Sequence, residues 1–192
     1  DYADLFAEEG GFDMPATATI GIAVKPNDRL ALMFDWQEIW YSDVGAVGNP
    51  IQNLFNCPTA GFGGTDLEGC LGGNRGGGFG WDDMTVYKFG ASYQLDDTWT
   101  LRGGYSFTDQ PIPKDQMTFN ILAPGVVQDH ITIGFSYAID KNSEISAMYG
   151  HAFDNEVTGP SLFNAVMGPG VGGNEKIRMS QDVIGVAFSM KF

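Results

Sequence analysis

The sequence lacks several features that would assign it to a common class of protein. No stretch approaches the ~18 uninterrupted apolar residues of a transmembrane helix. Only 10 of the 192 residues are Lys or Arg, against 24 Asp and Glu, so the formal charge is −14. A nucleic-acid-binding protein needs a basic face, and this charge argues against that function. Disorder is excluded as well, because 43% of the residues are hydrophobic and need burial.

Residues that carry enzyme or metal chemistry are also scarce. The histidines are His130 and His151, and no Ser/His/Asp spacing accompanies them, so we expect no enzyme activity. The glycine-rich run at 72–80 lacks the Gly-Lys-Ser/Thr ending of a phosphate-binding loop. Cys57 and Cys70 have no second pair of Cys or His at metal-ligand spacing. The sequence therefore predicts no catalytic residue, no metal site and no cofactor.

The chain is instead rich in apolar alternation with the period of a β-strand. In one segment, Ile131 and Ile133 alternate with Thr132 and Gly134. Large apolar side chains thus lie on one face, and Gly, Ser, Thr or Ala lie on the other. Seven such segments occur, at 15–25, 29–41, 81–95, 99–107, 130–139, 144–153 and 181–192.

The connections between these segments alternate in length. Short turns lie at 26–28, 96–98 and 140–142, whereas long loops at 43–80, 108–129 and 154–180 hold most of the Gly and Pro. Short turns at one end and long loops at the other are typical of outer-membrane β-barrels. We therefore predict an all-β fold, an antiparallel meander that forms part of a transmembrane β-barrel in the outer membrane of a Gram-negative bacterium.

The two faces of the segments favour a barrel over a soluble β-sandwich. In a sandwich the second face would be rich in Lys and Glu to meet bulk water, and here it is small and nearly neutral. A strand of about ten residues tilted by roughly 45° spans about 23 Å, close to the ~25 Å apolar band of such barrels. Aromatic residues gather at both ends of the segments, for example Trp81 and Trp99, as membrane-interface girdles do.

The number of segments predicts that the barrel extends beyond this sequence. Seven strands leave the two ends of the chain on opposite sides of the membrane, whereas single-chain bacterial barrels have an even number of strands. Seven strands also leave exposed edges in lipid. We therefore expect residues 15–192 to be the C-terminal part of a larger barrel. Residues 1–14, which are acidic and contain no Lys or Arg, would end a preceding extracellular loop.

Several stretches carry a resemblance to a known family. They are GWDDMTVYKFGASY at 80–93, DDTWTLRGGY at 96–105 and DQPIP at 109–113, together with Pro15-Ala16-Thr17, Asp35-Trp36 and the terminal Phe192. Over nearly all of residues 12–192 the chain resembles the FadL family, the long-chain fatty-acid transporters of Gram-negative outer membranes, whose relatives import aromatic hydrocarbons. The resemblance implies a barrel of about 14 strands with an N-terminal plug, of which this chain is similar to the last seven.

The function implied by this resemblance is passive transport of hydrophobic compounds, first long-chain fatty acids and second aromatic hydrocarbons. One alternative is a structural or adhesive barrel without a ligand. Another is a general porin for small polar solutes, which needs a charge-lined lumen. The expected partners are outer-membrane lipids, lipopolysaccharide and a hydrophobic small molecule, with no nucleic acid, and we expect the full-length protein to be monomeric.

Four residues are candidates for ligand contact. Lys88 and Arg102 fall on the small-residue face of adjacent segments and could hold a fatty-acid carboxylate through charge-assisted hydrogen bonds. The alternative is that they are neutralised inside the barrel, by Asp35 or by the plug. Phe119 and Leu122 belong to the apolar part of loop 108–129. This loop either lines a ligand path or packs against its neighbours as a cap.

The longest loop contains Cys57 and Cys70 and should face the oxidising exterior, so we expect a disulfide between them. It would stabilise the loop by about 3 kcal/mol on the chain-entropy model. The long loops also hold many carboxylates and few cations, which predicts a solvated acidic face. A sharper hypothesis is that divalent cations bridge this face to lipopolysaccharide.

Overall fold

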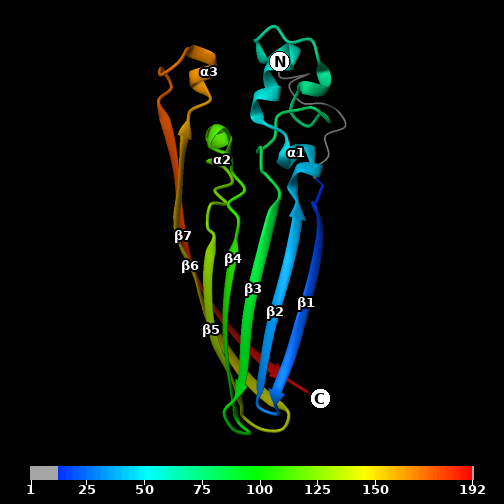
Figure 1. The fold of residues 1–192 in the computed structure, drawn as a ribbon, viewed down its shortest axis with the longest axis vertical. Helices are drawn as coiled ribbons and strands as arrows, with labels where there is room; N and C mark the ends of the chain where they lie inside the picture. The colour runs from blue at the N-terminus through cyan, green and yellow to red at the C-terminus, as the bar shows by residue number, and fades with distance from the viewer. Residues whose placement is uncertain (1–12, 192) are drawn as a thin grey trace.

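The computed structural model describes residues 13–191. Their seven strands form one antiparallel sheet (Figure 1). The strands pair in chain order from β1 to β7, and β1 and β7 do not pair with each other within the described range, so the sheet is open. The strands are β1 (Ala16–Asn27), β2 (Leu30–Trp40), β3 (Met84–Gln94), β4 (Trp99–Thr108), β5 (Asp129–Ala138), β6 (Ser143–Pro160) and β7 (Asn174–Met190). The predicted antiparallel meander is confirmed. The loop tail predicted at 1–14 and the terminal Phe192 lie almost wholly outside the described residues.

The long connections gather at one end of the sheet and the short turns at the other (Figure 1). The short helical elements are η1 (Tyr41–Asp43), α1 (Gly45–Gly48), η2 (Ile51–Asn56), η3 (Pro58–Ala60), η4 (Leu67–Gly69), η5 (Lys114–Gln116), α2 (Met117–Asn120) and α3 (Phe163–Met167). None of the helices in residues 13–191 has the length and apolar character needed to cross a membrane. The loop end of the sheet therefore carries all of the helical structure that is described.

Strand register fixes two continuous faces. Phe34 lies opposite Phe89, which in turn lies opposite Tyr105. This apolar face continues to Ile133, and its large side chains are exposed, with Phe89 at 52% and Ile133 at 58%. On the other side Gly90 lies opposite Gly104, and we call this side the small-residue face. Both faces agree with the predicted alternation, because a one-residue slip in register would have exchanged them.

The last hairpin is longer than the sequence predicted. The loop expected at 154–180 is only 161–173, because β6 continues to Pro160 and β7 begins at Asn174. A bulge between Ala152 and Asn155 adds one residue to β6. Two salt bridges join the strands here, Arg178 to Asp154 within the bulge and Lys176 to Glu156 beyond it. The other two long loops, 41–83 and 109–128, lie close to their predicted bounds.

Candidate functional site

The two cations predicted to contact a ligand lie on the small-residue face of adjacent strands. Lys88 of β3 lies directly opposite Asp35 of β2, yet its Nζ donates to Oε1 of Gln37 at 2.7 Å. Arg102 of β4 donates from Nη1 to Oγ of Ser136 at 2.5 Å. No salt bridge to either cation is present among residues 13–191. Among the described residues, the hydrogen-bond partners of both cations are therefore neutral.

Arg102 is held by a chain of hydroxyl groups. Ser136 is 2% exposed, and its Oγ lies 2.7 Å from Oγ of Ser146. Ser146 donates to Oε1 of Glu144 at 3.0 Å. Two serines thus connect the guanidinium on β4 to the carboxylate of Glu144 on β6, two strands away. This arrangement orients Arg102 without direct charge neutralisation.

The structure does not bring Lys88 and Arg102 into one site. Lys88 lies opposite Ser106, whereas Arg102 lies opposite Ser92, four residues further along β3. At about 3.3 Å per residue, the two positions are about 13 Å apart along the strand. One carboxylate can therefore contact only one of the two cations at a time.

Loop 109–128 packs as a cap over the loop end of the sheet. Ile112, Met117 and Val126 are buried there against Ile177 of β7, and Trp81, Val157 and Met179 pack on this cluster. The cap alternative for this loop therefore describes these buried residues. Of the predicted ligand residues, Phe119 lies between buried Met117 and Asn120 and stacks on Phe79 with ring centroids 4.8 Å apart, and Leu122 is 75% exposed.

Two buried polar residues, which the sequence analysis did not single out, join loop 109–128 to loop 41–83. Asn120 is fully buried, accepts from Nε1 of Trp81 and donates to the carbonyls of Phe79 and Gln116. Gln116 is 4% exposed and accepts the backbone N–H of Ile51 at 3.0 Å. We call Asn120 and Gln116 the polar hub of the cap.

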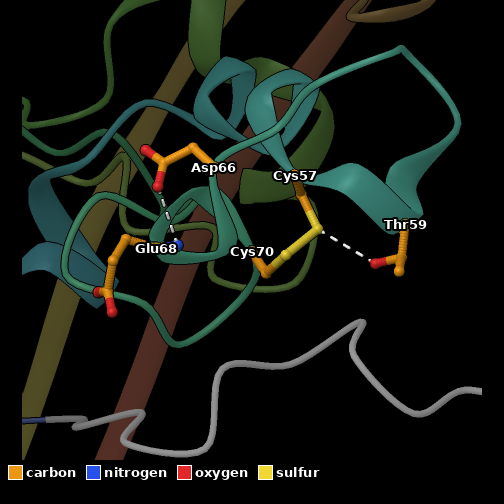
Figure 2. Close-up of a disulfide and its surroundings, with 5 residues drawn as sticks. All are labelled: Cys57, Thr59, Asp66, Glu68 and Cys70. Carbon is orange, nitrogen blue, oxygen red and sulfur yellow. Dashed lines mark hydrogen bonds between the residues drawn. A yellow bond between two sulfur atoms is a disulfide. The ribbon is translucent and has the colours of Figure 1, made fainter.

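A disulfide closes the middle of loop 41–83. Cys57 and Cys70 are bonded, with Cα atoms 4.6 Å apart, and both are buried. Figure 2 shows the bridge beside Asp66, whose Oδ1 accepts the backbone N–H of Glu68. Asp66 also forms two hydrogen bonds with Arg75, and these hold the pKa of the Asp66 carboxyl below its ordinary value. The loop is thus a small structured lobe.

The acidic loops show ion pairs and no metal-binding cluster. No group of three or more His, Cys, Asp or Glu within residues 13–191 is arranged to hold a metal ion. Three of the loop carboxylates form salt bridges with Arg75, Lys176 and Arg178, and their side chains remain 35–49% exposed. The described carboxylates therefore offer a bridging cation at most a shared, open site.

Comparison with known proteins places this arrangement among outer-membrane transport proteins. The family model "Outer membrane protein transport protein (OMPP1/FadL/TodX)" matches residues 9–192. A putative outer membrane protein of Neisseria meningitidis, NMB0088, is 28% identical over 115 residues, which are 58% of this chain and 24% of the relative. The long-chain fatty acid transport protein of Escherichia coli is 28% identical over 89 residues, 45% of this chain and 20% of the relative.

A similar sheet occurs in a solved structure. The toluene transporter TodX of Pseudomonas putida superimposes with a TM-score of 0.58 and 21% identity, covering 95% of this chain and 36% of that chain. At this identity the likeness concerns the fold alone. The matched regions span about a quarter of the curated relatives and about a third of the solved structure.

Proposed function

Because the chain belongs to the OMPP1/FadL/TodX family of Gram-negative outer-membrane transport proteins, we propose that the protein provides a passive route for hydrophobic compounds, and that long-chain fatty acids are its main substrates. The proposal rests on the small-residue face of the sheet, found in a chain of this transport family. Gly90 and Gly104 lie opposite each other at mid-strand on that face. They leave room for a ligand beside the strands, while the apolar face meets lipid.

The two separated cations favour a ligand with one acidic head. A carboxylate gains charge-assisted hydrogen bonds from Lys88 or Arg102, and an aromatic hydrocarbon gains neither. Because the cations lie about 13 Å apart along the sheet, they act as successive contacts on one path. Leu122 and Phe119 lie in the cap at the loop end, where they offer apolar surface to the tail of an entering molecule.

Sparse charge on the small-residue face argues against a general porin. That face carries four charged side chains, Asp35, Lys88, Arg102 and Glu144, among glycines, serines and threonines, whereas a pore for polar solutes needs a lumen lined by charges. An adhesive barrel without a ligand would have no need for unneutralised cations on this face. Movement along the route needs no energy source, because the proposed contacts are binding sites and not a pump.

Growth on oleate as sole carbon source tests the proposal in a strain that lacks its own fatty-acid transporter. We expect the full-length gene to restore growth. A leak of small sugars without growth on oleate would contradict fatty-acid transport and support a porin. Growth on toluene without growth on oleate would contradict the preference for fatty acids.

Oleate titration of the purified full-length protein tests the two cations. We expect Lys88→Ala and Arg102→Ala each to weaken binding about tenfold, the equivalent of one lost charged hydrogen bond. Lys141→Ala, in the short turn between β5 and β6, is the matched control and should bind oleate as the wild type does. Unchanged affinity in both test variants would remove the ligand role from Lys88 and Arg102.

A further inference from the structure

A polar cavity of about 520 Å³ lies between loop 109–128 and the upper part of β6. Its base is formed by Ile112 and Val157, which also belong to the buried cluster of the cap. Asp82, Gln110 and Thr158 contribute polar side chains to its walls. The cavity therefore has an apolar base and a polar rim, and it is separate from Lys88 and Arg102.

Gln110 carries an unsatisfied hydrogen-bond donor at this cavity. Its Nε2 is the one buried side-chain nitrogen or oxygen without a hydrogen-bond partner in the part of the chain that the structure describes. An unpaired buried donor costs about 1–3 kcal/mol, so an acceptor supplied by a ligand would recover that free energy. Within residues 13–191, the side chains of Asp82 and Thr158 also form no hydrogen bond, so their oxygen atoms can bond to a ligand.

The register places two of the cavity's β6 residues, Glu156 and Thr158, on the lipid side of the sheet, and the other two, Asn155 and Val157, on the opposite side. Beyond the bulge in β6, Glu156 and Thr158 lie opposite Arg178 and Lys176. These β7 residues share their face with Ile184, which belongs to the apolar face. The polar walls at Glu156 and Thr158 thus continue the lipid-facing surface toward the loop end.

The height of the cavity matches the head region of the outer leaflet. Asp182 marks the upper edge of the apolar face, where it pairs with Tyr149 and His151. The β7 residues beside the cavity lie four to six positions beyond it. This is about 13–20 Å along the strand and, for a tilt of roughly 40°, about 10–15 Å along the membrane normal. The cavity is above the hydrocarbon, among lipid head groups.

We propose that this cavity binds a saccharide unit of the glycolipid that surrounds the protein in the outer leaflet. A sugar hydroxyl both donates and accepts, so it can accept from Gln110 and from the Lys114 ammonium and donate to Asp82 and Glu156. A lone phosphate would face both carboxylates, and a metal ion would face Lys114. Hydroxyl groups match the whole lining, and the outer-membrane location of the family supplies the saccharide.

Calorimetric titration with delipidated core oligosaccharide tests the proposal on the full-length protein in detergent. We expect Gln110→Leu and Thr158→Val each to weaken binding at least fivefold. Gln94→Leu, at the short-turn end of β3, is the matched control and should bind as the wild type does. The thermal midpoint without saccharide should not fall in Gln110→Leu, because the variant removes a donor that has no partner.

A second arm identifies the source of the saccharide. Wild-type protein purified from nanodiscs should retain more full-core lipopolysaccharide than Gln110→Leu does, and both should retain core-truncated lipopolysaccharide equally. Equal oligosaccharide affinity in wild type and Gln110→Leu would overturn the site. Binding that disappears on addition of EDTA would overturn direct recognition in favour of a metal bridge. Binding of free sugar without glycolipid retention would overturn the glycolipid assignment.

Discussion

The polar hub offers a direct perturbation of the cap, through Asn120→Leu. The variant keeps the volume of the side chain and removes three hydrogen bonds, one from Nε1 of Trp81 at 2.5 Å and two to the carbonyls of Phe79 and Gln116 at 2.6 and 2.7 Å. Each group left unpaired in a buried site costs about 1–3 kcal/mol. The summed loss is therefore at least about 3 kcal/mol for cap closure.

This loss should act on the cap and not on the sheet. The strands are joined to one another by their own backbone ladders, whereas the hub bonds to residues of loop 41–83, namely Ile51, Gln52, Phe79 and Trp81. We expect trypsin to cleave folded Asn120→Leu after Arg75 or Lys114 roughly a hundredfold faster than wild type, the rate change that about 3 kcal/mol of local opening gives. The far-ultraviolet circular dichroism of the sheet should not change.

A matched control separates the hub from loops in general. Asn164 also uses both ends of its amide, but it bonds to Gly172 and Gly173 inside its own loop. Asn164→Leu should therefore leave cleavage after Arg75 within twofold of wild type. Cleavage of Asn120→Leu within twofold of wild type would refute the hub as the link between the two loops.

Three further variants test other parts of the loop end. Gly159→Ala puts a Cβ against the Lys114 carbonyl oxygen, inside van der Waals contact, so hydrogen exchange should show a cap less stable by about 1–3 kcal/mol. Cys57→Ala should destabilise the lobe of loop 41–83 by about 3 kcal/mol, measured by proteolysis of the loop, and leave the sheet intact. Because the hydrogen bonds from Arg75 lower the pKa of Asp66, this pairing stabilises the lobe above the ordinary pKa of the carboxyl, and the stabilisation is lost as the pH falls through the lowered pKa. Arg75→Gln should therefore flatten the acid dependence of lobe proteolysis.

The local sequence pattern was sufficient to predict which residues lie on each face of the sheet. The alternation of Ile131 and Ile133 with Thr132 and Gly134 has period two, and one lipid-facing side forces that register on each strand. The turns at 96–98 and 140–142 follow in the same way, because Asp side chains there accept backbone N–H groups two or three residues ahead.

The longer hairpin could not be read from the same pattern. Above the membrane, the exposed face of β6 and β7 is charged, with Glu156 beside Lys176. The opposite side of this hairpin carries few apolar residues, such as Val157 and Ile177, and they pack on loop 109–128 and not on lipid. Such a segment has the composition of a solvated loop, and only the cross-strand pairing makes it a hairpin.

The polar hub and the hydrogen-bond partner of Lys88 could not be predicted from local sequence, because both depend on contacts between segments far apart in the chain. Asn120 and Trp81 are 39 residues apart, and a buried Asn has no local signal that distinguishes it from an exposed one. For Lys88, the sequence offered Asp35 as the neutralising partner, and the register does place the two opposite each other. The long lysine side chain instead reaches diagonally to Gln37.

Uptake of radiolabelled oleate by cells expressing full-length variants tests the central claim, that the small-residue face lines the substrate route. Gly90 lies on that face, with side-chain atoms of Met33 as the nearest neighbours of an added Cβ, and Gly103 lies on the apolar face with similar space. Gly90→Trp should reduce uptake at least tenfold, and Gly103→Trp should transport as the wild type does, with both variants inserted in the outer membrane in equal amounts. Wild-type uptake through Gly90→Trp, or loss of uptake only in Gly103→Trp, would contradict the account.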